Sequence, residues 1–422
     1  MIMDHFSYKN GTLFCEKVSL KEIAQDVGTP FYCYSSAHLK EQFLAYKRGF
    51  GSRKHLICFA VKSNSNLAVL ACLGALGAGA DIVSGGELYR ALKAGIPANR
   101  IVYSGVGKTE EEMAYALESG IAMFNVESME EMKLLSHVAK KMNTQAPIAF
   151  RVNPDVDPKT HPYISTGLKE NKFGLFMDQA LDAYNMASND PHLLIRGIDC
   201  HIGSQIVEIE PFIHAFKRLK RLIAKIEENG IRLSFIDLGG GLGISYREET
   251  PPTPENYISA ITKEAGDLSQ TIIVEPGRSI CGNAGVLVTK ILYTKENDTK
   301  KFYIVDAGMN DLGRPSLYDA YHEIRPVEHV DSQKVQEADV VGPICETGDF
   351  LARSRPLPEL ESGALLAVLS AGAYGFTMSS NYNSRPRVPE VMVSEDKFYV
   401  VRKRESWKDL VALESIPQGG LC

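Results

Sequence analysis

The sequence lacks the features that would point to a membrane, nucleic-acid-binding or disulfide-stabilised protein. No stretch approaches the ~18 uninterrupted apolar residues of a membrane-spanning helix, and the first residues show no signal or transit peptide. The eight cysteines form no C-x-x-C pair, which argues against a zinc site or a disulfide framework and favours the reducing cytoplasm. With 46 basic and 52 acidic residues, a net charge of −6 and no basic block, nucleic acid is not an expected partner.

The order of the apolar runs predicts an α/β barrel followed by a β-rich domain. Eight short β-branched runs alternate with segments of helical spacing, which is the pattern of a parallel sheet. Eight such units fit a (β/α)8 TIM barrel; the alternative, an open doubly wound sheet, usually carries a G-x-G-x-x-G turn, which is absent. We expect N-terminal strands in residues 1–35, the barrel in 36–284, and a β sandwich or partly open barrel in 285–422, which the N-terminal strands join.

Polar and glycine residues follow four of the eight predicted strands. They are Lys62 after the first strand, His201 and Ser204 after the sixth, Gly239–Gly241 after the seventh, and Glu275, Gly277 and Arg278 after the eighth. In a (β/α)8 barrel the carboxyl ends of all strands meet at one rim, where the chemistry takes place. We therefore expect these residues to converge.

This combination of residue types indicates a site for pyridoxal 5′-phosphate. The amine of Lys62 can form an imine with an aldehyde, successive glycine N–H groups can wrap a phosphate, and Arg278 can add charge or hold a carboxylate. Glu275 would keep the pyridine nitrogen protonated, and His201 could stack on the ring. Taken singly, Lys62 could be a solvated lysine, the glycines a tight turn and His201 a hydrogen-bonded core residue.

The ordered set of motifs resembles the fold-type III pyridoxal phosphate decarboxylases, whose barrel is similar to that of alanine racemase. The motifs are "FAVKSN", "NPDVDPKTHPYISTGLKENKFG", "CHIGSQI", "DLGGGLGISY", "EPGRSI", "DAGMNDLGRPSLYDAYH", "GPICETGDFLA" and "AGAYGFTMSSNYNSRPR". They cover nearly the whole chain and are most similar to those of the members that act on diaminopimelate. Where the family usually has tyrosine and alanine, this chain has Phe59 and Ser63, positions at which we expect packing differences only.

The resemblance implies decarboxylation of meso-diaminopimelate to L-lysine and carbon dioxide, the last step of lysine biosynthesis. The residues implied to bind the cofactor are Lys62, Asp81, His201, Ser204, Gly240, Gly241, Glu275, Gly277, Arg278 and Tyr374. Those implied to bind the substrate are Arg278, Arg314, Tyr318, Glu346 and Tyr374. Lys62, His201 and Cys345 are the implied catalytic residues, with Cys345 as the proton donor, and no metal is implied. The resemblance also implies an obligate homodimer in which Cys345 and Glu346 of the partner subunit complete each site.

Other readings remain open at the level of sequence. An ornithine or arginine decarboxylase could use the same fold, and decarboxylation of ornithine but not of diaminopimelate would identify it. An alanine-racemase-like activity is less favoured, because that chemistry prefers an arginine at the position of Glu275. A non-catalytic protein that only carries the cofactor would need the barrel but not the motifs "GPICETGDF" and "DAGMNDLGRP" beyond it.

Overall fold

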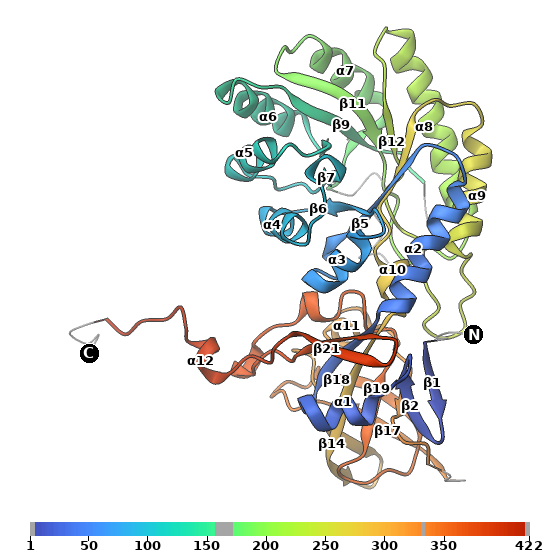
Figure 1. The fold of residues 1–422 in the computed structure, drawn as a ribbon, viewed down its shortest axis with the longest axis vertical. Helices are drawn as coiled ribbons and strands as arrows, with labels where there is room; N and C mark the ends of the chain where they lie inside the picture. The colour runs from blue at the N-terminus through green and yellow to red at the C-terminus, as the bar shows by residue number, and fades with distance from the viewer. Residues whose placement is uncertain (1–4, 157–171, 331–333, 418–422) are drawn as a thin grey trace. The chain divides into compact units, whose positions relative to one another are not determined.

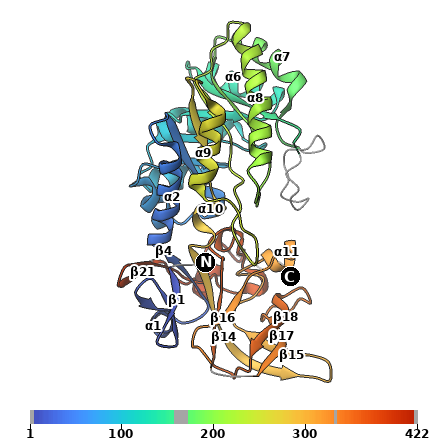
Figure 2. The same cartoon turned by 90° about the vertical axis from the view of Figure 1, so that its right-hand side faces the viewer.

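A computed structural model of the chain describes residues 5–156, 172–330 and 334–417. Most of the motif "NPDVDPKTHPYISTGLKENKFG" therefore lies outside the described residues. The chain divides into two compact units, one of residues 38–282 and one that combines residues 1–37 with 283–422. Figures 1 and 2 show the chain in two views, with many of its helices and strands labelled.

The unit of residues 38–282 contains a closed barrel of eight parallel strands. In the order in which they pair, the strands are β9 (Ala146–Asn153), β11 (Leu193–Asp199), β12 (Phe235–Asp237), β13 (Thr271–Val274), β5 (His55–Ala60), β6 (Gly79–Ile82), β7 (Ile101–Tyr103) and β8 (Met123–Val126). Because β8 pairs again with β9, the ring closes and leaves no free edge. The predicted (β/α)8 barrel is therefore confirmed, and the open doubly wound sheet is excluded. A short extra strand, β10 (Leu175–Phe176), pairs with β9 outside the ring.

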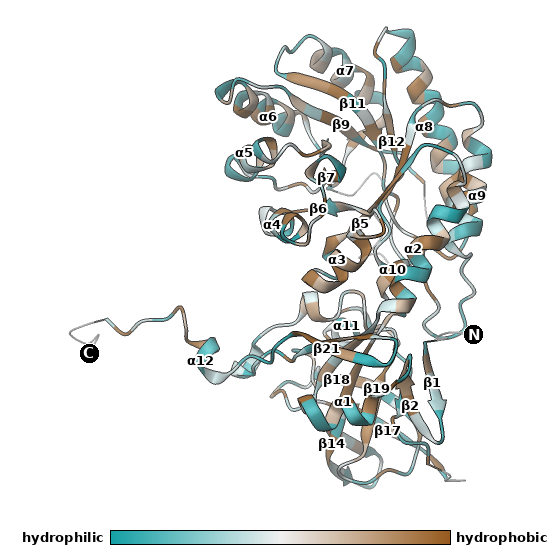
Figure 3. Ribbon diagram, viewed as in Figure 1, coloured by the Kyte–Doolittle hydropathy of each residue, from teal (hydrophilic) through white to brown (hydrophobic). Residues whose placement is uncertain are grey.

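Helices surround the barrel strands (Figure 1). They are α2 (Ser36–Phe50), α3 (Leu67–Gly74), α4 (Gly85–Lys93), α5 (Glu110–Ser119), α6 (Met129–Lys141), α7 (Met177–Ser188), α8 (Glu210–Glu228), α9 (Pro254–Ala265) and α10 (Arg278–Cys281). In α8 the buried residues recur every three or four positions, as one face of a helix requires: Phe212, Ala215, Phe216, Leu219, Leu222, Ile223 and Ile226. Figure 3 shows the consequence, with largely hydrophobic barrel strands and helices that carry both kinds of residue.

The barrel strands read as nearly continuous apolar runs because both of their faces are covered. Every residue of β6 and β8 is buried, as expected for parallel strands with side chains inside the ring and helices outside it. One buried cluster takes residues from five strands: Leu56, Cys58, Val102, Met123, Ala149 and Ile273. Polar residues are then left for the carboxyl ends of the strands, where the ring opens.

The second unit is a β-rich domain whose strands come from both ends of the sequence. Its larger sheet has the order β18 (Phe350–Pro358), β17 (Val335–Val341), β15 (Lys301–Val305), β14 (Gly285–Glu296), β4 (Phe31–Ser35), β20 (Glu390–Ser394) and β21 (Lys397–Arg402). In addition, β19 (Leu365–Val368) pairs with β14 and with β16 (Ile324–Pro326). Because β4 lies between β14 and β20, the N-terminal segment joins the C-terminal domain, as predicted.

The first three strands form a small sheet of their own. They are β1 (Phe6–Lys9), β2 (Thr12–Cys15) and β3 (Val18–Ser19), followed by α1 (Leu20–Val27). Phe6 and Leu13 of this sheet share one hydrophobic core with Phe31, Val286 and Val391 of the larger sheet. Short helices complete the unit: α11 (Arg314–Tyr318), α12 (Trp407–Leu410) and the 3-10 turns η4 (Phe376–Met378) and η5 (Tyr382–Ser384).

Across the described residues, no helix combines the length and the hydropathy that a membrane crossing requires.

Candidate active site

The predicted lysine lies at the rim of the barrel and is held by a buried carboxylate. Lys62 belongs to the 3-10 turn η1 (Val61–Ser63), which directly follows β5. Its Nζ lies 2.5 Å from Oδ2 of Asp81, the third residue of β6, and the Asp81 side chain is fully buried. The other oxygen of Asp81, Oδ1, has no hydrogen-bond partner among the described residues. Lys62 therefore points along the rim and is not simply solvated.

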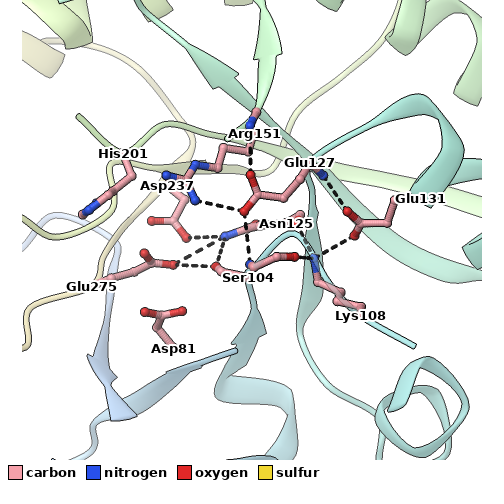
Figure 4. Close-up of polar contacts among 12 residues, drawn as sticks. Asp81, Ser104, Lys108, Asn125, Glu127, Glu131, Arg151, His201, Asp237 and Glu275 are labelled. Carbon is pink, nitrogen blue, oxygen red and sulfur yellow. Dashed lines mark hydrogen bonds and ion pairs between the residues drawn. The ribbon is translucent and has the colours of Figure 1, made fainter. Parts of the chain in front are cut away.

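Three buried carboxylates gather beside this lysine, from the ends of β11, β12 and β13. Oxygen atoms of Asp199, Asp237 and Glu275 all lie within 4.8 Å of one another. Nδ2 of Asn125 donates to Oδ2 of Asp237 and to Oε1 of Glu275, each at 3.4 Å (Figure 4). This arrangement concentrates negative charge at one point of the rim.

The carboxylates of this cluster are difficult to ionise together. Burial raises the pKa of Glu275 well above its usual range, and the charges of Asp237 and Asp81 raise it further, while Lys62 opposes them. Burial likewise raises the pKa of Asp237 to about 6, although the N–H of Gly239, 3.0 Å from Oδ1, favours the charged form. The cluster must therefore hold protons or be balanced by a cation.

The glycine turn after β12 packs so closely that only glycine fits. A Cβ on Gly240 would lie 2.3 Å from the carbonyl oxygen of Glu275, and Gly241 has a φ of +118°. The N–H of Gly240 donates to Nδ1 of His201 at 3.1 Å. Burial, with the positive charges of Arg151 and Lys62, lowers the pKa of His201 well below its usual value, so the ring is neutral.

The arginine that follows β13 is linked to two hydroxyl groups. Arg278 is buried, and its Nη1 donates to the Tyr246 hydroxyl at 2.6 Å while its Nη2 donates to Oγ of Ser204 at 3.2 Å. The predicted residues Arg278 and Ser204 are thus brought together. Gly277 lies against the turn η1 that follows β5, because a Cβ on Gly277 would meet the side chain of Ser63 at 2.9 Å.

A second buried network lies beside the carboxylate cluster (Figure 4). Nη1 of Arg151 lies 2.9 Å from Oε1 of Glu127. Nζ of Lys108 lies 2.7 Å from Oε1 of Glu131 and donates to the carbonyl oxygen of Asn125 at 2.8 Å. Because Lys108 binds the backbone of Asn125, this network fixes the residue whose side chain joins Asp237 and Glu275.

The β-rich unit carries the other predicted residues, several of them on two connected segments. Arg314 and Tyr318 begin and end α11, and Arg314 is buried. Oγ of Ser316, in the same helix, donates to the carbonyl oxygen of Gly348 at 2.6 Å. Asp349 accepts the N–H of Met309 through Oδ1, at 2.6 Å. These contacts tie α11 and the turn before it to the loop of residues 342–349, which contains Cys345 and Glu346.

The loop that contains Cys345 is held from a second side by residues 382–384. Oδ1 of Asn383 accepts the backbone N–H of Cys345 at 2.8 Å, and the Tyr382 hydroxyl donates to Oε2 of Glu346 at 3.1 Å. Cys345 is an exposed free thiol. The remaining predicted residue, Tyr374, has a φ of +56°, a conformation that few non-glycine residues adopt and that often marks functional sites.

The family model for the pyridoxal-binding domain of pyridoxal-dependent decarboxylases matches residues 36–282, which span the whole barrel. The chain belongs to the pyridoxal-dependent decarboxylase family. Within this family, the diaminopimelate decarboxylase of Aquifex aeolicus is 53% identical over 408 residues, or 96% of each chain. That of Pseudomonas aeruginosa is 52% identical and covers 98% of this chain and 99% of its own. The crystal structure of diaminopimelate decarboxylase from Helicobacter pylori complexed with L-lysine has a TM-score of 0.90 at 47% identity and covers 93% of this chain and 98% of that one.

The rim fits the cofactor of the pyridoxal-dependent decarboxylases in three respects. The turn of Gly240 and Gly241 carries no side chains and lies on the rim with the buried Arg278, so an anionic phosphate could approach bare backbone beside a positive charge. The cluster around Glu275 has an excess of carboxylates, which favours the positive charge of a protonated pyridine nitrogen. An amine for the aldehyde is present at Lys62, on the same rim.

Several residues of this site were not found from the sequence. They are Ser104, whose Oγ donates to Oε1 of Glu275 at 3.4 Å, and Asn125, Glu127, Arg151, Asp199, Asp237 and Tyr246. All but Tyr246 lie in the last residues of a barrel strand or directly after it. The available signal was therefore a polar residue at the end of an apolar run, but such residues also cap turns, so the signal is weak without the fold.

Proposed function

We propose that this chain catalyses the pyridoxal-phosphate-dependent decarboxylation of meso-diaminopimelate to L-lysine and carbon dioxide. The observation that carries the proposal is the 52–53% identity to diaminopimelate decarboxylases over at least 96% of the chain. L-lysine, the expected product, is the ligand of the related protein from Helicobacter pylori. Among the residues that the structure describes, no contact at the site favours ornithine or arginine as the substrate over diaminopimelate.

Residues of the barrel rim, together with Tyr374 of the β-rich unit, would hold the cofactor. Lys62 would bind its aldehyde carbon, with Asp81 fixing the position of the amine. The residues that would bind the phosphate are Ser204, Gly240, Gly241, Gly277, Arg278 and Tyr374. When bound, pyridoxal phosphate supplies an electron-accepting ring that stabilises the negative charge left on the substrate Cα as carbon dioxide leaves.

The buried carboxylates would tune that ring. Glu275 faces the rim from β13, and the neighbouring Asp237 and Asp199 raise the cost of leaving the cluster without a cation. A positive ring nitrogen lowers that cost, so the cluster favours the protonated ring, which is the better electron acceptor. His201, held neutral and oriented by the N–H of Gly240, would pack on the ring without adding a competing positive charge.

Residues of the β-rich unit would bind the head of the substrate that does not react. This head carries a carboxylate and an ammonium group, so it needs one cationic and one anionic partner. Arg314 with Tyr318 would bind the carboxylate, and Glu346 the ammonium. The thiol of Cys345 would then donate a proton to the Cα from which carbon dioxide has left. The exposure of Cys345 leaves this thiol accessible.

We also propose that the enzyme is a cytoplasmic homodimer with shared sites. Cys345 of the partner subunit and Glu346 of the partner subunit would complete the site that contains Lys62. The cysteines of the described residues are all free thiols, which is compatible with a reducing compartment. Mixing Lys62→Ala and Cys345→Ala subunits tests the sharing, because half of the sites in a mixed dimer are then intact. We expect recovery of about one quarter of the wild-type activity, and no recovery if each site uses one chain.

One assay tests the proposed reaction. Purified protein is loaded with pyridoxal phosphate and supplied with meso-diaminopimelate, ornithine or arginine, and the products are identified by mass spectrometry. We expect L-lysine from diaminopimelate and little turnover of the other two. Release of carbon dioxide from ornithine or arginine but not from diaminopimelate would refute the proposal.

A further inference from the structure

A buried histidine contacts the arginine that we assign to the unreacted substrate carboxylate. Nη1 of Arg314 lies 3.0 Å from Nε2 of His322, and the His322 side chain has no solvent exposure. Arg314 is the first residue of α11, and His322 lies in the segment between α11 and β16. The two residues are eight positions apart in the sequence, and the fold brings their side chains together.

The second ring nitrogen determines which atom of His322 carries the proton. Nδ1 lies 2.8 Å from the carbonyl oxygen of Leu369, which can only accept, so Nδ1 must donate. A guanidinium group can only donate, so Nε2 must accept from Arg314. His322 is then a neutral imidazole with one defined tautomer, and both of its nitrogens are oriented.

The carbonyl oxygen that accepts from Nδ1 of His322 lies at the end of a paired strand of the β-rich unit. Leu369 directly follows β19, and its N–H donates to the carbonyl oxygen of Glu323 at 2.8 Å. Next to this bond, Ile324 of β16 pairs with Val368 of β19. Because Val368 and Leu369 are both buried, the position of the imidazole is set by the sheet and not by solvent.

We propose that His322 is a positioning residue that fixes the guanidinium of Arg314 for the carboxylate of the unreacted substrate head. It thereby selects ligands that keep this carboxylate over diamines that lack it. This inference rests on the proposed function, because it concerns the substrate head that Arg314 would bind.

The chemistry of the pair explains why a histidine suits this position. A carboxylate is bound most strongly when two parallel N–H groups of the planar guanidinium face its two oxygens, so the orientation of the plane matters. An aspartate or glutamate in place of His322 would orient the plane but also cancel its charge. A neutral imidazole orients the guanidinium and leaves its positive charge for the ligand.

Two substitutions separate the contacts of His322. In His322→Asn the shorter side chain can still donate to Leu369 but cannot reach Arg314. In His322→Gln the longer side chain can place an acceptor near the position of Nε2. The variants are therefore matched in polarity and charge and differ in whether they can accept from Arg314.

The experiment measures binding of L-lysine and of cadaverine to the cofactor-loaded protein by calorimetry. Cadaverine has the chain and both amines of lysine but no carboxylate. For His322→Asn we expect L-lysine binding to weaken about 10- to 100-fold, since a hydrogen bond to a charged group is lost. Binding of cadaverine should be unchanged, and His322→Gln should restore most of the affinity for L-lysine.

Equal weakening of both ligands, or unchanged binding of L-lysine, would overturn the inference. The stoichiometry of binding corrects for any misfolded fraction. As a second measurement, His322→Asn is combined with Arg314→Lys, and no further loss of L-lysine binding is expected if His322 acts through Arg314. An additional loss of similar size in that background would also overturn it. Failure of the wild-type protein to decarboxylate diaminopimelate would instead contradict the proposed function, so the two failures are distinct.

Discussion

The glycine turn after β12 allows a prediction whose size follows from the structure. In Gly240→Ala the new Cβ would lie 2.3 Å from the carbonyl oxygen of Glu275, whereas ordinary contact begins at 3.4 Å. The backbone sets the positions of both atoms, so neither can move away by a side-chain rotation and the turn must shift by about 1 Å. Such overpacking typically destabilises a structure by about 1–3 kcal/mol. The movement also loosens the N–H of Gly240 from His201.

We expect this shift to weaken cofactor binding, because the backbone of Gly240 and Gly241 would move away from the place where it would meet the phosphate. If the cost falls on the bound state, the dissociation constant for pyridoxal phosphate rises about 5- to 150-fold. The assay is a titration of the cofactor-free protein with pyridoxal phosphate, followed by absorbance, together with a thermal melt of the same sample.

Gly107→Ala is the matched control. Gly107 follows β7 on the same rim, a Cβ there would meet nothing within 4 Å, and its backbone is not left-handed. The control should bind the cofactor as the wild type does. If Gly240→Ala binds pyridoxal phosphate as tightly as the control and melts at the same temperature, the reasoning from close packing is wrong.

Three further predictions concern the lysine, the exposed thiol and the carboxylate cluster. Borohydride should fix the cofactor to a peptide containing Lys62 and to none in Lys62→Ala; a labelled peptide from another lysine would contradict the assignment. Cys345→Ala should retain the cofactor absorbance but lose about 100-fold or more in kcat. Cys72→Ala, at another free cysteine, should keep the kcat of the wild type. Equal kcat values for the two variants would remove Cys345 from the mechanism. The pKa of Asp237 is raised by burial from 3.8 to about 6, so the folded protein binds more protons than the unfolded one between these pH values. The unfolding free energy of the cofactor-free protein, measured by urea denaturation, should therefore fall by up to about 3 kcal/mol as the pH rises from about 4 to about 6. The fall should be smaller in Asp237→Asn. The same pH dependence in the wild type and in Asp237→Asn would show that Asp237 does not titrate in this range.

The sequence alone determined the barrel and the part of the site that follows its strands. The apolar runs are local patterns, and parallel strands in a closed ring must end at one rim, so the positions of Lys62, His201, Gly240 and Glu275 could be predicted from their places along the chain. The β-rich nature of the second unit could also be predicted. The entry of β4 between β14 and β20 is a long-range pairing, which only the folded chain makes visible.

The tertiary structure alone decided which buried groups interact with one another. Asn125 joins Asp237 to Glu275, Tyr246 contacts Arg278, and His322 contacts Arg314. Nothing in the spacing of these residues indicates the contacts, because each depends on which side chains from different elements point to the same place. The raised pKa of Asp237 follows from burial and neighbouring charges in the same way. A sequence can therefore reveal which residues reach the rim, but the environment that sets their charge exists only in the folded protein.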